Sequence, residues 1–139
     1  MTARAAIEAA TDALAAAGCD TPRLDAELLL ADALGVDRTA LAVEPERPVP
    51  PRAARLAMER IRRRVTREPV AYILGRRGFR GIELAVDRRV LIPRPETELL
   101  VEVAAELAPP GGRVHDVGTG AGAVAQALKH ERPDLVVSA

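Results

Sequence analysis

Hydrophobic positions recur at helical spacing through the first half of the chain. The first set has apolar residues three or four positions apart: Ile7, Ala10, Leu14 and Ala17. This spacing predicts a helix that Gly18 ends. The second set has the same spacing and predicts one buried stripe: Leu24, Leu28, Ala31 and Leu34. Thr21 and Pro22 begin that helix as an N-cap residue and a proline at the first helical position, and Gly35 ends it.

A proline-rich loop separates these helices from a longer helical stretch. A short helix is expected from Asp37 to about Val43, and the prolines at positions 45, 48, 50 and 51 then exclude a helix interior. In RAARLAMERIRRRVTRE the apolar residues are again three or four positions apart: Ala54, Met58, Ile61 and Val65. This stretch gives the clearest helical pattern of the chain.

The same stretch carries five arginines: Arg60, Arg62, Arg63, Arg64 and Arg67. One interpretation is a contact surface for an acidic or RNA-bearing partner. The other is a solvated face, which Glu59 would support by pairing with Arg63 four residues later. Cations near the end of a helix are also favourable on their own. The sequence leaves both interpretations open.

The pattern changes to period two after Gly75. Ile82, Leu84 and Val86 alternate with less apolar residues, and the alternation resumes after a polar break at positions 87–88. Such a pattern predicts a β-hairpin that turns at this break and returns through residues 90–92. Prolines 93 and 95 end the hairpin, and a helix with acidic residues in its first turn follows until the PPGG stretch at 109–112.

The last part of the sequence predicts a strand, a glycine-rich loop, a helix and a second strand, which is the beginning of a nucleotide-binding α/β unit. In VHDVGTGAGA the glycine spacing fits both the dinucleotide pattern, with Ala123 in third place, and the G-x-G-x-G loop of S-adenosylmethionine enzymes. A tight turn with a purely structural role is a third possibility. Asp116 favours S-adenosylmethionine, because a carboxylate repels a pyrophosphate but suits an ammonium and a sulfonium.

Composition narrows the classes of partner. The 20 acidic and 20 basic residues cancel, so no net charge favours nucleic acid. Tyr72 and Phe79 are the only aromatic residues, and both are expected to pack rather than to bind a ligand. Cys19 is the single cysteine, so neither a disulfide nor a cysteine metal site is expected. No apolar run approaches the roughly 20 residues of a membrane span. We therefore expect a cytoplasmic protein with no membrane or direct nucleic-acid partner.

Three stretches before the glycine loop form a more specific pattern: REPVAYILG at 67–75, the F-x-G at 79–81, and VLIPRPETELLV at 90–101. In this order and spacing they closely resemble the bacterial peptide chain release factor glutamine methyltransferases, the HemK/PrmC family. RLDAELLLADALG at 23–35 is also similar to the N-terminal helical domain of that family. The resemblance runs from about residue 20 to the last residue and concerns the N-terminal portion of the family only.

The resemblance implies an α+β protein in three parts. Residues 1–75 would form an all-α helical bundle that binds the release factor, and residues 76–92 would form a β-hairpin linker. Residues 93–139 would be the truncated start of a Rossmann-like α/β methyltransferase domain. The methyl donor would be S-adenosyl-L-methionine, and the acceptor would be the glutamine side-chain amide in the Gly-Gly-Gln loop of release factors.

Carried over by position, one set of residues would line the cofactor: Asp116, Gly118, Thr119, Gly120, Ala121 and Gly122. Glu96 and Thr97 would lie close to it, although a carboxylate in the first turn of a helix is stabilising for local reasons as well. His115 and Ala121 depart from the family pattern, which commonly has an apolar residue and a Ser or Thr there. No catalytic role is assigned to His115, and His130 is expected only to favour the end of its helix.

The substrate-binding motif of the family is absent from these residues. The resemblance implies an Asn-Pro-Pro-Tyr motif that holds the glutamine amide, and the sequence contains no asparagine, so we assign no catalytic residue. An acidic residue that holds the ribose is expected only after Ala139, and Asp134 lies at the opposite end of its strand. We expect no turnover by these residues alone, a compact unit over 1–92, and marginal stability for 93–139.

Two other functions are compatible with the sequence. A non-catalytic module that binds a release factor without modifying it would need only the helical part. A nicotinamide-dependent enzyme would use the glycine loop, but Asp116 and the IPRPETE motif both argue against it.

Overall fold

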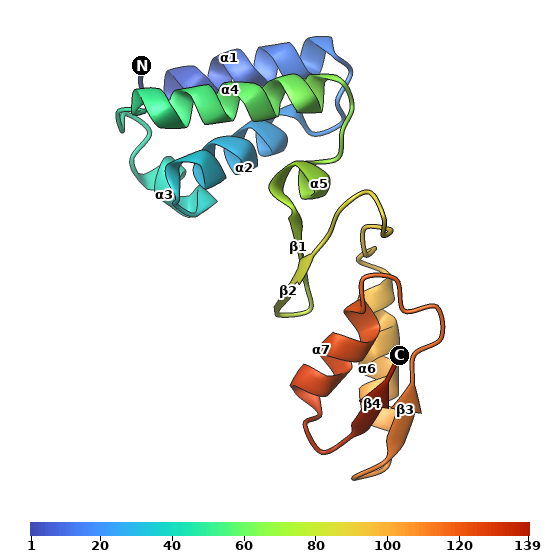
Figure 1. Cartoon of the computed structure of the whole chain (residues 1–139). Coiled ribbons are helices and arrows are strands. Elements are labelled where there is room, and N and C mark those ends of the chain that lie inside the picture. The colour runs from blue at the N-terminus through green and yellow to red at the C-terminus, as the bar shows by residue number, and fades with distance from the viewer. The chain divides into compact units, whose positions relative to one another are not determined.

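A computed structural model describes residues 1–139, and its contacts divide the chain into two compact units. The first unit is Met1–Leu74 and the second is Gly75–Ala139. Figure 1 shows a first unit built of helices and a second unit that combines short strands with two helices. No helix in the structure is both long enough and apolar enough to span a membrane.

The first unit contains five helices, whose bounds agree with most of the sequence predictions: α1 Ala3–Ala16, α2 Pro22–Leu34, α3 Arg38–Val43, α4 Pro51–Val65 and α5 Val70–Leu74. Gly18 and Gly35 follow α1 and α2 with φ of 71° and 68°, a left-handed conformation that ends a helix at little cost only in glycine. Asp37 accepts a hydrogen bond from the Ala40 N–H at 3.0 Å and caps α3. Short helix α5 had no counterpart in the sequence analysis.

Helix α2 is more deeply buried than predicted, and the predicted stripe is displaced. Ala31 is buried as predicted, but Leu24 is 38% exposed, and the other buried residues of α2 lie one or two positions after Leu24 and Leu28: Asp25, Ala26, Leu29 and Leu30. The reason is that α2 contacts α1, α3, α4 and α5, so a wide face is covered rather than one stripe. Thr21 occupies the N-cap position but does not cap the backbone. Its Oγ1 donates to Asp25 Oδ1 instead, at 2.9 Å.

The β-hairpin lies earlier than the sequence analysis placed it. Strands β1 (Arg76–Phe79) and β2 (Ile82–Ala85) pair antiparallel, and residues 86–92 form no strand. The two-residue turn consists of Arg80 and Gly81, with φ of 42° and 78°, as in a type I′ turn. A turn does form at the predicted break, where the Val90 N–H donates to the Asp87 carbonyl at 3.1 Å and the Asp87 side chain accepts from Arg89. The predicted return strand through residues 90–92 is wrong, because β2 pairs with β1 instead.

The hairpin belongs to the second unit. Strand β2 packs on helix α7 (Ala123–Glu131), and the chain divides after Leu74 rather than after residue 92. Phe79, at the end of β1, is 3% exposed, which confirms its packing role. The hairpin therefore extends the core of the unit that carries the glycine loop.

The rest of the second unit follows the predicted order of elements. Helix α6 (Thr97–Leu107) precedes β3 (Arg113–His115), and β4 (Val136–Ser138) follows α7. Strands β3 and β4 are parallel, and Val114 pairs with Val137. The core is formed by apolar side chains from these elements and the hairpin: Phe79, Leu84, Val101, Ala127, Leu128 and Leu135. Helix α6 keeps only Val101 fully buried, and its remaining large apolar side chains are exposed.

Candidate functional site

The glycine loop begins where β3 ends. Asp116 donates its backbone N–H to the Ser138 carbonyl at 2.8 Å, which continues the parallel ladder by one residue. Gly118, Gly120 and Gly122 then all have positive φ, between 56° and 76°. Each would cost roughly 1–2 kcal/mol for a residue with a Cβ atom. Glycines at these three positions therefore let the chain turn sharply from the strand into α7.

The Asp116 carboxylate organises this turn. Its Oδ2 accepts a hydrogen bond from Thr119 Oγ1 at 2.8 Å and one from the Ala125 N–H at 3.3 Å. The second bond satisfies a free N–H in the first turn of α7, where the N-cap residue Gly122 has no side chain to do so. Asp116 Oδ1 accepts no hydrogen bond from the chain and remains available to a ligand.

Two further contacts fix the start of α7. The Gly122 N–H donates to the Thr119 carbonyl at 2.8 Å, and Gln126 Nε2 donates to the Ala121 carbonyl at 3.1 Å. A Cβ atom at Gly122 would lie 2.7 Å from Gln126 Nε2. The structure thus brings Asp116, Thr119, Ala121 and Gly122 into one hydrogen-bonded turn, in which Gly118 and Gly120 also lie. Their role in holding a cofactor stays a prediction.

Glu96 and Thr97 lie at the start of α6, and no hydrogen bond or ion pair joins either of them to the glycine loop. Glu96 occupies the N-cap position without a side-chain cap, and Thr97 donates its N–H to the Arg94 carbonyl at 3.1 Å. Figure 1 shows the beginning of α6 and the glycine loop at the same end of the second unit. The predicted proximity of Glu96 and Thr97 to a cofactor therefore stays a prediction.

Arg80, which sequence analysis missed, connects the hairpin to both helices of the unit. Its backbone N–H donates to Glu98 Oε1 at 3.1 Å, and its guanidinium pairs with Glu131 and with Glu102. The hydrogen bond to Glu131 raises the pKa of Arg80 above its ordinary value. These contacts hold a non-glycine residue at φ 42°. The only signal in the sequence was the Arg-Gly pair directly after an apolar strand residue.

The opposite end of the β3–β4 sheet has its own polar cluster. Arg132 donates to the Ala105 and Ala108 carbonyls, which lie at the end of α6. Asp134 pairs with Arg132 at 2.8 Å and accepts the Gly111 N–H at 3.0 Å, and both contacts lower the pKa of Asp134. In space, Asp134 thus lies beside the residues that precede β3, whereas Asp116 lies where β3 ends.

His115 contacts Ser138 across the same sheet. These two residues are register partners, and His115 Nδ1 lies 2.9 Å from Ser138 Oγ. Both side chains are exposed. The contact explains how a polar residue is accommodated at the end of β3, and it assigns no chemistry to His115.

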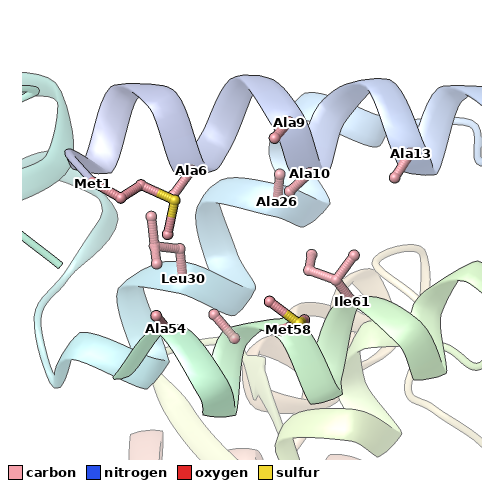
Figure 2. A pocket seen from close by; sticks show the side chains of 11 residues that line it. Met1, Ala6, Ala9, Ala10, Ala13, Ala26, Leu30, Ala54, Met58 and Ile61 are labelled. Atoms are coloured by element: carbon pink, nitrogen blue, oxygen red, sulfur yellow. The ribbon is translucent and has the colours of Figure 1, made fainter. Parts of the chain in front are cut away.

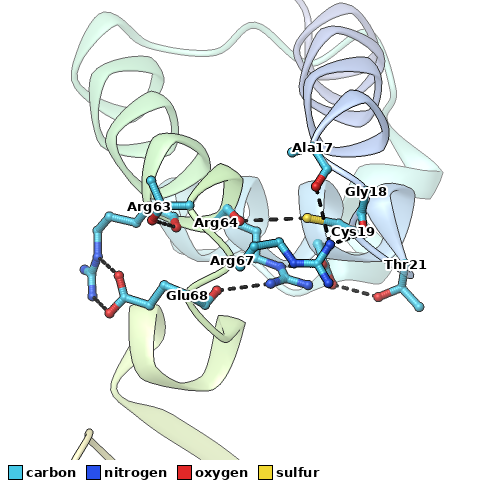
Figure 3. Close-up of polar contacts among 10 residues, drawn as sticks. Ala17, Gly18, Cys19, Thr21, Arg63, Arg64, Arg67 and Glu68 are labelled. Carbon is cyan, nitrogen blue, oxygen red and sulfur yellow. Dashed lines mark hydrogen bonds and ion pairs between the residues drawn. The ribbon is translucent and has the colours of Figure 1, made fainter.

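The arginines of α4 and the residues after it are mostly engaged within the helical unit (Figure 3). Arg64 Nε pairs with Asp25 Oδ2 at 2.7 Å, and both side chains are nearly buried. Arg63 binds the Glu68 carboxylate through two hydrogen bonds of 2.8 Å. Arg67 donates to the carbonyls of Ala17 and Gly18 at the end of α1.

Arg60 also pairs internally, with Asp32 at 2.5 Å. Four of the five arginines therefore connect α4, or the residues directly after it, to other parts of the unit, and neither sequence interpretation describes them. They are not a free contact surface, and they are not simply solvated. Arg62 and Arg67 are exposed without a carboxylate partner, but Arg67 binds backbone carbonyls, whereas Arg62 Nη2 lies 3.5 Å from Met58 Sδ.

The chain thus consists of a helical unit and a second unit in which a strand, a glycine loop and a helix follow one another. This combination defines the class of protein. A family model described as the PrmC N-terminal domain matches residues 5–75. A curated release factor glutamine methyltransferase of Koribacter versatilis is 45% identical over 141 aligned residues, which cover 100% of this chain and 50% of the relative. The enzyme of the same name from Vibrio cholerae is 44% identical, with 99% of this chain and 49% of the relative covered.

A relative from Cereibacter sphaeroides with the same name is 44% identical over 96% of this chain and 47% of its own length. The chain belongs to the PrmC family of release factor glutamine methyltransferases and corresponds to the N-terminal portion of its members. It spans about half the length of the curated relatives it matches.

Proposed function

We propose that the chain is the N-terminal part of an S-adenosyl-L-methionine-dependent release factor glutamine methyltransferase. The observation that carries this proposal is the 45% identity with a curated enzyme of that name along the whole chain. In this proposal the helices of residues 1–75 bind the release factor. The second unit supplies one wall of the cofactor site in a Rossmann-like domain, and the protein acts in the cytoplasm.

The geometry of the glycine loop supports this cofactor. Asp116 keeps one carboxylate oxygen free while the other organises the loop, so it can accept a hydrogen bond from the ammonium of S-adenosyl-L-methionine without loss of the turn. A carboxylate at this position opposes a pyrophosphate, which the first turn of α7 would otherwise attract. The three glycines allow a ligand to lie against the loop backbone.

The proposed reaction moves the methyl group of S-adenosyl-L-methionine to the glutamine amide nitrogen of the Gly-Gly-Gln loop. That nitrogen is a poor nucleophile because its lone pair is delocalised into the carbonyl, so most of the rate must come from orientation and electrostatics. Residues 1–139 include no asparagine that could hold the amide. We therefore expect this chain to bind the release factor but to transfer no methyl group by itself.

Calorimetric titration of the chain with S-adenosyl-L-methionine and, separately, with NADH tests the cofactor. We expect binding of the first and none of the second. Asp116→Asn is the informative variant, because its amide oxygen can still accept from Thr119 and Ala125 while the charge is lost. It should weaken S-adenosyl-L-methionine binding about ten-fold or more, equivalent to ~1.4 kcal/mol. Asp87→Asn, the same change in an exposed loop, should have no effect. Binding of NADH, or equal affinities for both variants, would refute the assignment.

The alternative is a non-catalytic module that binds release factors. The observation that favours it is the family-model match, which is confined to the helical residues 5–75. The titration with S-adenosyl-L-methionine and a release-factor binding assay together distinguish the methyltransferase from the non-catalytic module. Release-factor binding by a chain that binds no S-adenosyl-L-methionine would favour the module.

A further inference from the structure

An apolar groove runs between α1 and α4 of the helical unit, with α2 as its floor (Figure 2). Its volume is about 210 Å³, and its lining is almost entirely apolar. The residues on α1 are all alanines, and Met58 and Ile61 of α4 face them across the groove. Helices α1 and α4 both pack on α2. Because the alanine side chains of α1 are short, space remains between α1 and α4.

The size of the groove indicates what it could hold. Pockets for cofactors and other small ligands usually measure about 300–1,000 Å³ and include several polar groups. This groove is smaller and lacks such groups, which suits one or two apolar side chains from another protein. Met58 is 53% exposed at the edge, and a flexible thioether adapts well to a partner surface.

The edge of the groove on α4 carries a net positive charge, because two exposed arginines outnumber one exposed glutamate, Glu59. Arg62 is exposed, and its guanidinium lies against Met58 Sδ at 3.5 Å. Arg55 is exposed three residues before Met58 and therefore shares that surface of the helix. No carboxylate of the chain pairs with either guanidinium, in contrast to Arg60, Arg63 and Arg64. A partner with acidic side chains beside an apolar anchor would complement this edge.

We propose that the α1–α4 groove is the docking site for an acidic amphipathic helix of the release factor. An apolar side chain of that helix enters the groove between Ala13 and Met58, and its acidic residues face Arg55 and Arg62. This inference rests on the proposed function, and it adds the place and the chemistry of the contact. The mode is that of a helix laid into a groove, with one buried anchor dominating the affinity.

Two matched pairs of variants test the proposal by titration of the full chain with a purified bacterial release factor. Ala13 is exposed and lines the groove, so Ala13→Leu fills the groove without entering the core. Ala5→Leu makes the same change at an exposed position of α1 outside the groove. Arg62→Glu reverses the charge at the edge, and Arg113→Glu reverses an exposed charge of the second unit. Circular dichroism confirms that each variant remains folded.

Filling the groove or reversing the edge charge should each weaken binding about ten-fold or more, while the two controls change it less than about two-fold. Higher ionic strength should weaken binding of the unaltered chain more than that of Arg62→Glu. Binding that survives both groove variants, or that falls equally in the controls, overturns the groove and leaves the proposed function intact. Failure of the unaltered chain to bind any release factor overturns the docking site together with the release-factor role.

Discussion

The ion pair between Asp25 and Arg64 is predicted to be the most important polar contact of the helical unit. The side chains are 7% and 13% exposed, and the Nε–Oδ2 distance is 2.7 Å. Thr21 donates to the other carboxylate oxygen, and Arg64 also donates to the Glu68 carbonyl at 3.3 Å. The pair thus joins the start of α2 to the end of α4 in a place that water barely reaches.

Replacement of Asp25 by alanine leaves the Arg64 charge nearly buried without its carboxylate. Loss of one partner of such a pair costs about 3–5 kcal/mol. For a unit of this size each kcal/mol lowers the melting temperature by about 4–8 °C, so we expect a decrease of at least ~12 °C. The double variant Asp25→Leu with Arg64→Met should recover much of this loss, because it removes both charges and fills the space.

The chain offers a specific probe for this measurement. Tyr72 is the only tyrosine, tryptophan is absent, and Tyr72 lies in α5 of the helical unit. Its fluorescence during heating therefore reports on that unit and not on the second one. Glu46→Ala, which removes an exposed pair with Arg4, is the control and should leave the midpoint close to that of the unaltered chain. A decrease below about 2 °C for Asp25→Ala, or a double variant as unstable as the single one, would refute the reasoning.

Three further predictions concern the second unit. Arg80→Gly should be more stable in urea than Arg80→Ala by about 0.5–1 kcal/mol, because both lose the ion pairs but only glycine relieves the positive φ; equal midpoints would contradict this. Folding lowers the pKa of Asp134 from its ordinary value of 3.8, so this residue stabilises the folded state at pH values above 3.8. The contribution is lost as the pH falls below 3.8. Urea midpoints of Asp134→Asn should therefore depend less on pH in the acid range than those of the unaltered chain, and parallel curves would count against the contact. Gly122→Ala should destabilise the unit by about 1–2 kcal/mol in urea and displace the Gln126 amide, and an unchanged midpoint would exclude strain at this position.

Helix limits could be read from the sequence because local chemistry determines them. Pro22 and Gly35 delimit α2 through backbone geometry alone, and Asp37 caps α3 with its own side chain. The same reasoning failed for the buried face of α2. Burial there depends on how many neighbours surround the helix, and the apolar spacing of Leu24 and Leu28 carries no information about α3, α4 and α5.

The polar contacts of both units could not be predicted from the sequence, because their partners lie far apart along the chain. Asp25 and Arg64 are 39 positions apart, and Arg80 and Glu131 are 51 apart. Neither pair has a local spacing that would single it out among 20 acidic and 20 basic residues. Asp116 was identified by its place before the glycines, yet its second role as a cap for α7 needed the folded loop.

Hydrogen exchange of the unaltered chain, measured by mass spectrometry with each proposed ligand in turn, tests the central claim most directly. With a release factor added, amides of α1 and α4 should exchange more slowly while the second unit is unchanged. With S-adenosyl-L-methionine added, protection should appear in the glycine loop, in the first turn of α7 and at the start of α6, and nowhere in the helical unit. Exchange that neither ligand alters, or S-adenosyl-L-methionine protection in the helical unit, would contradict the account.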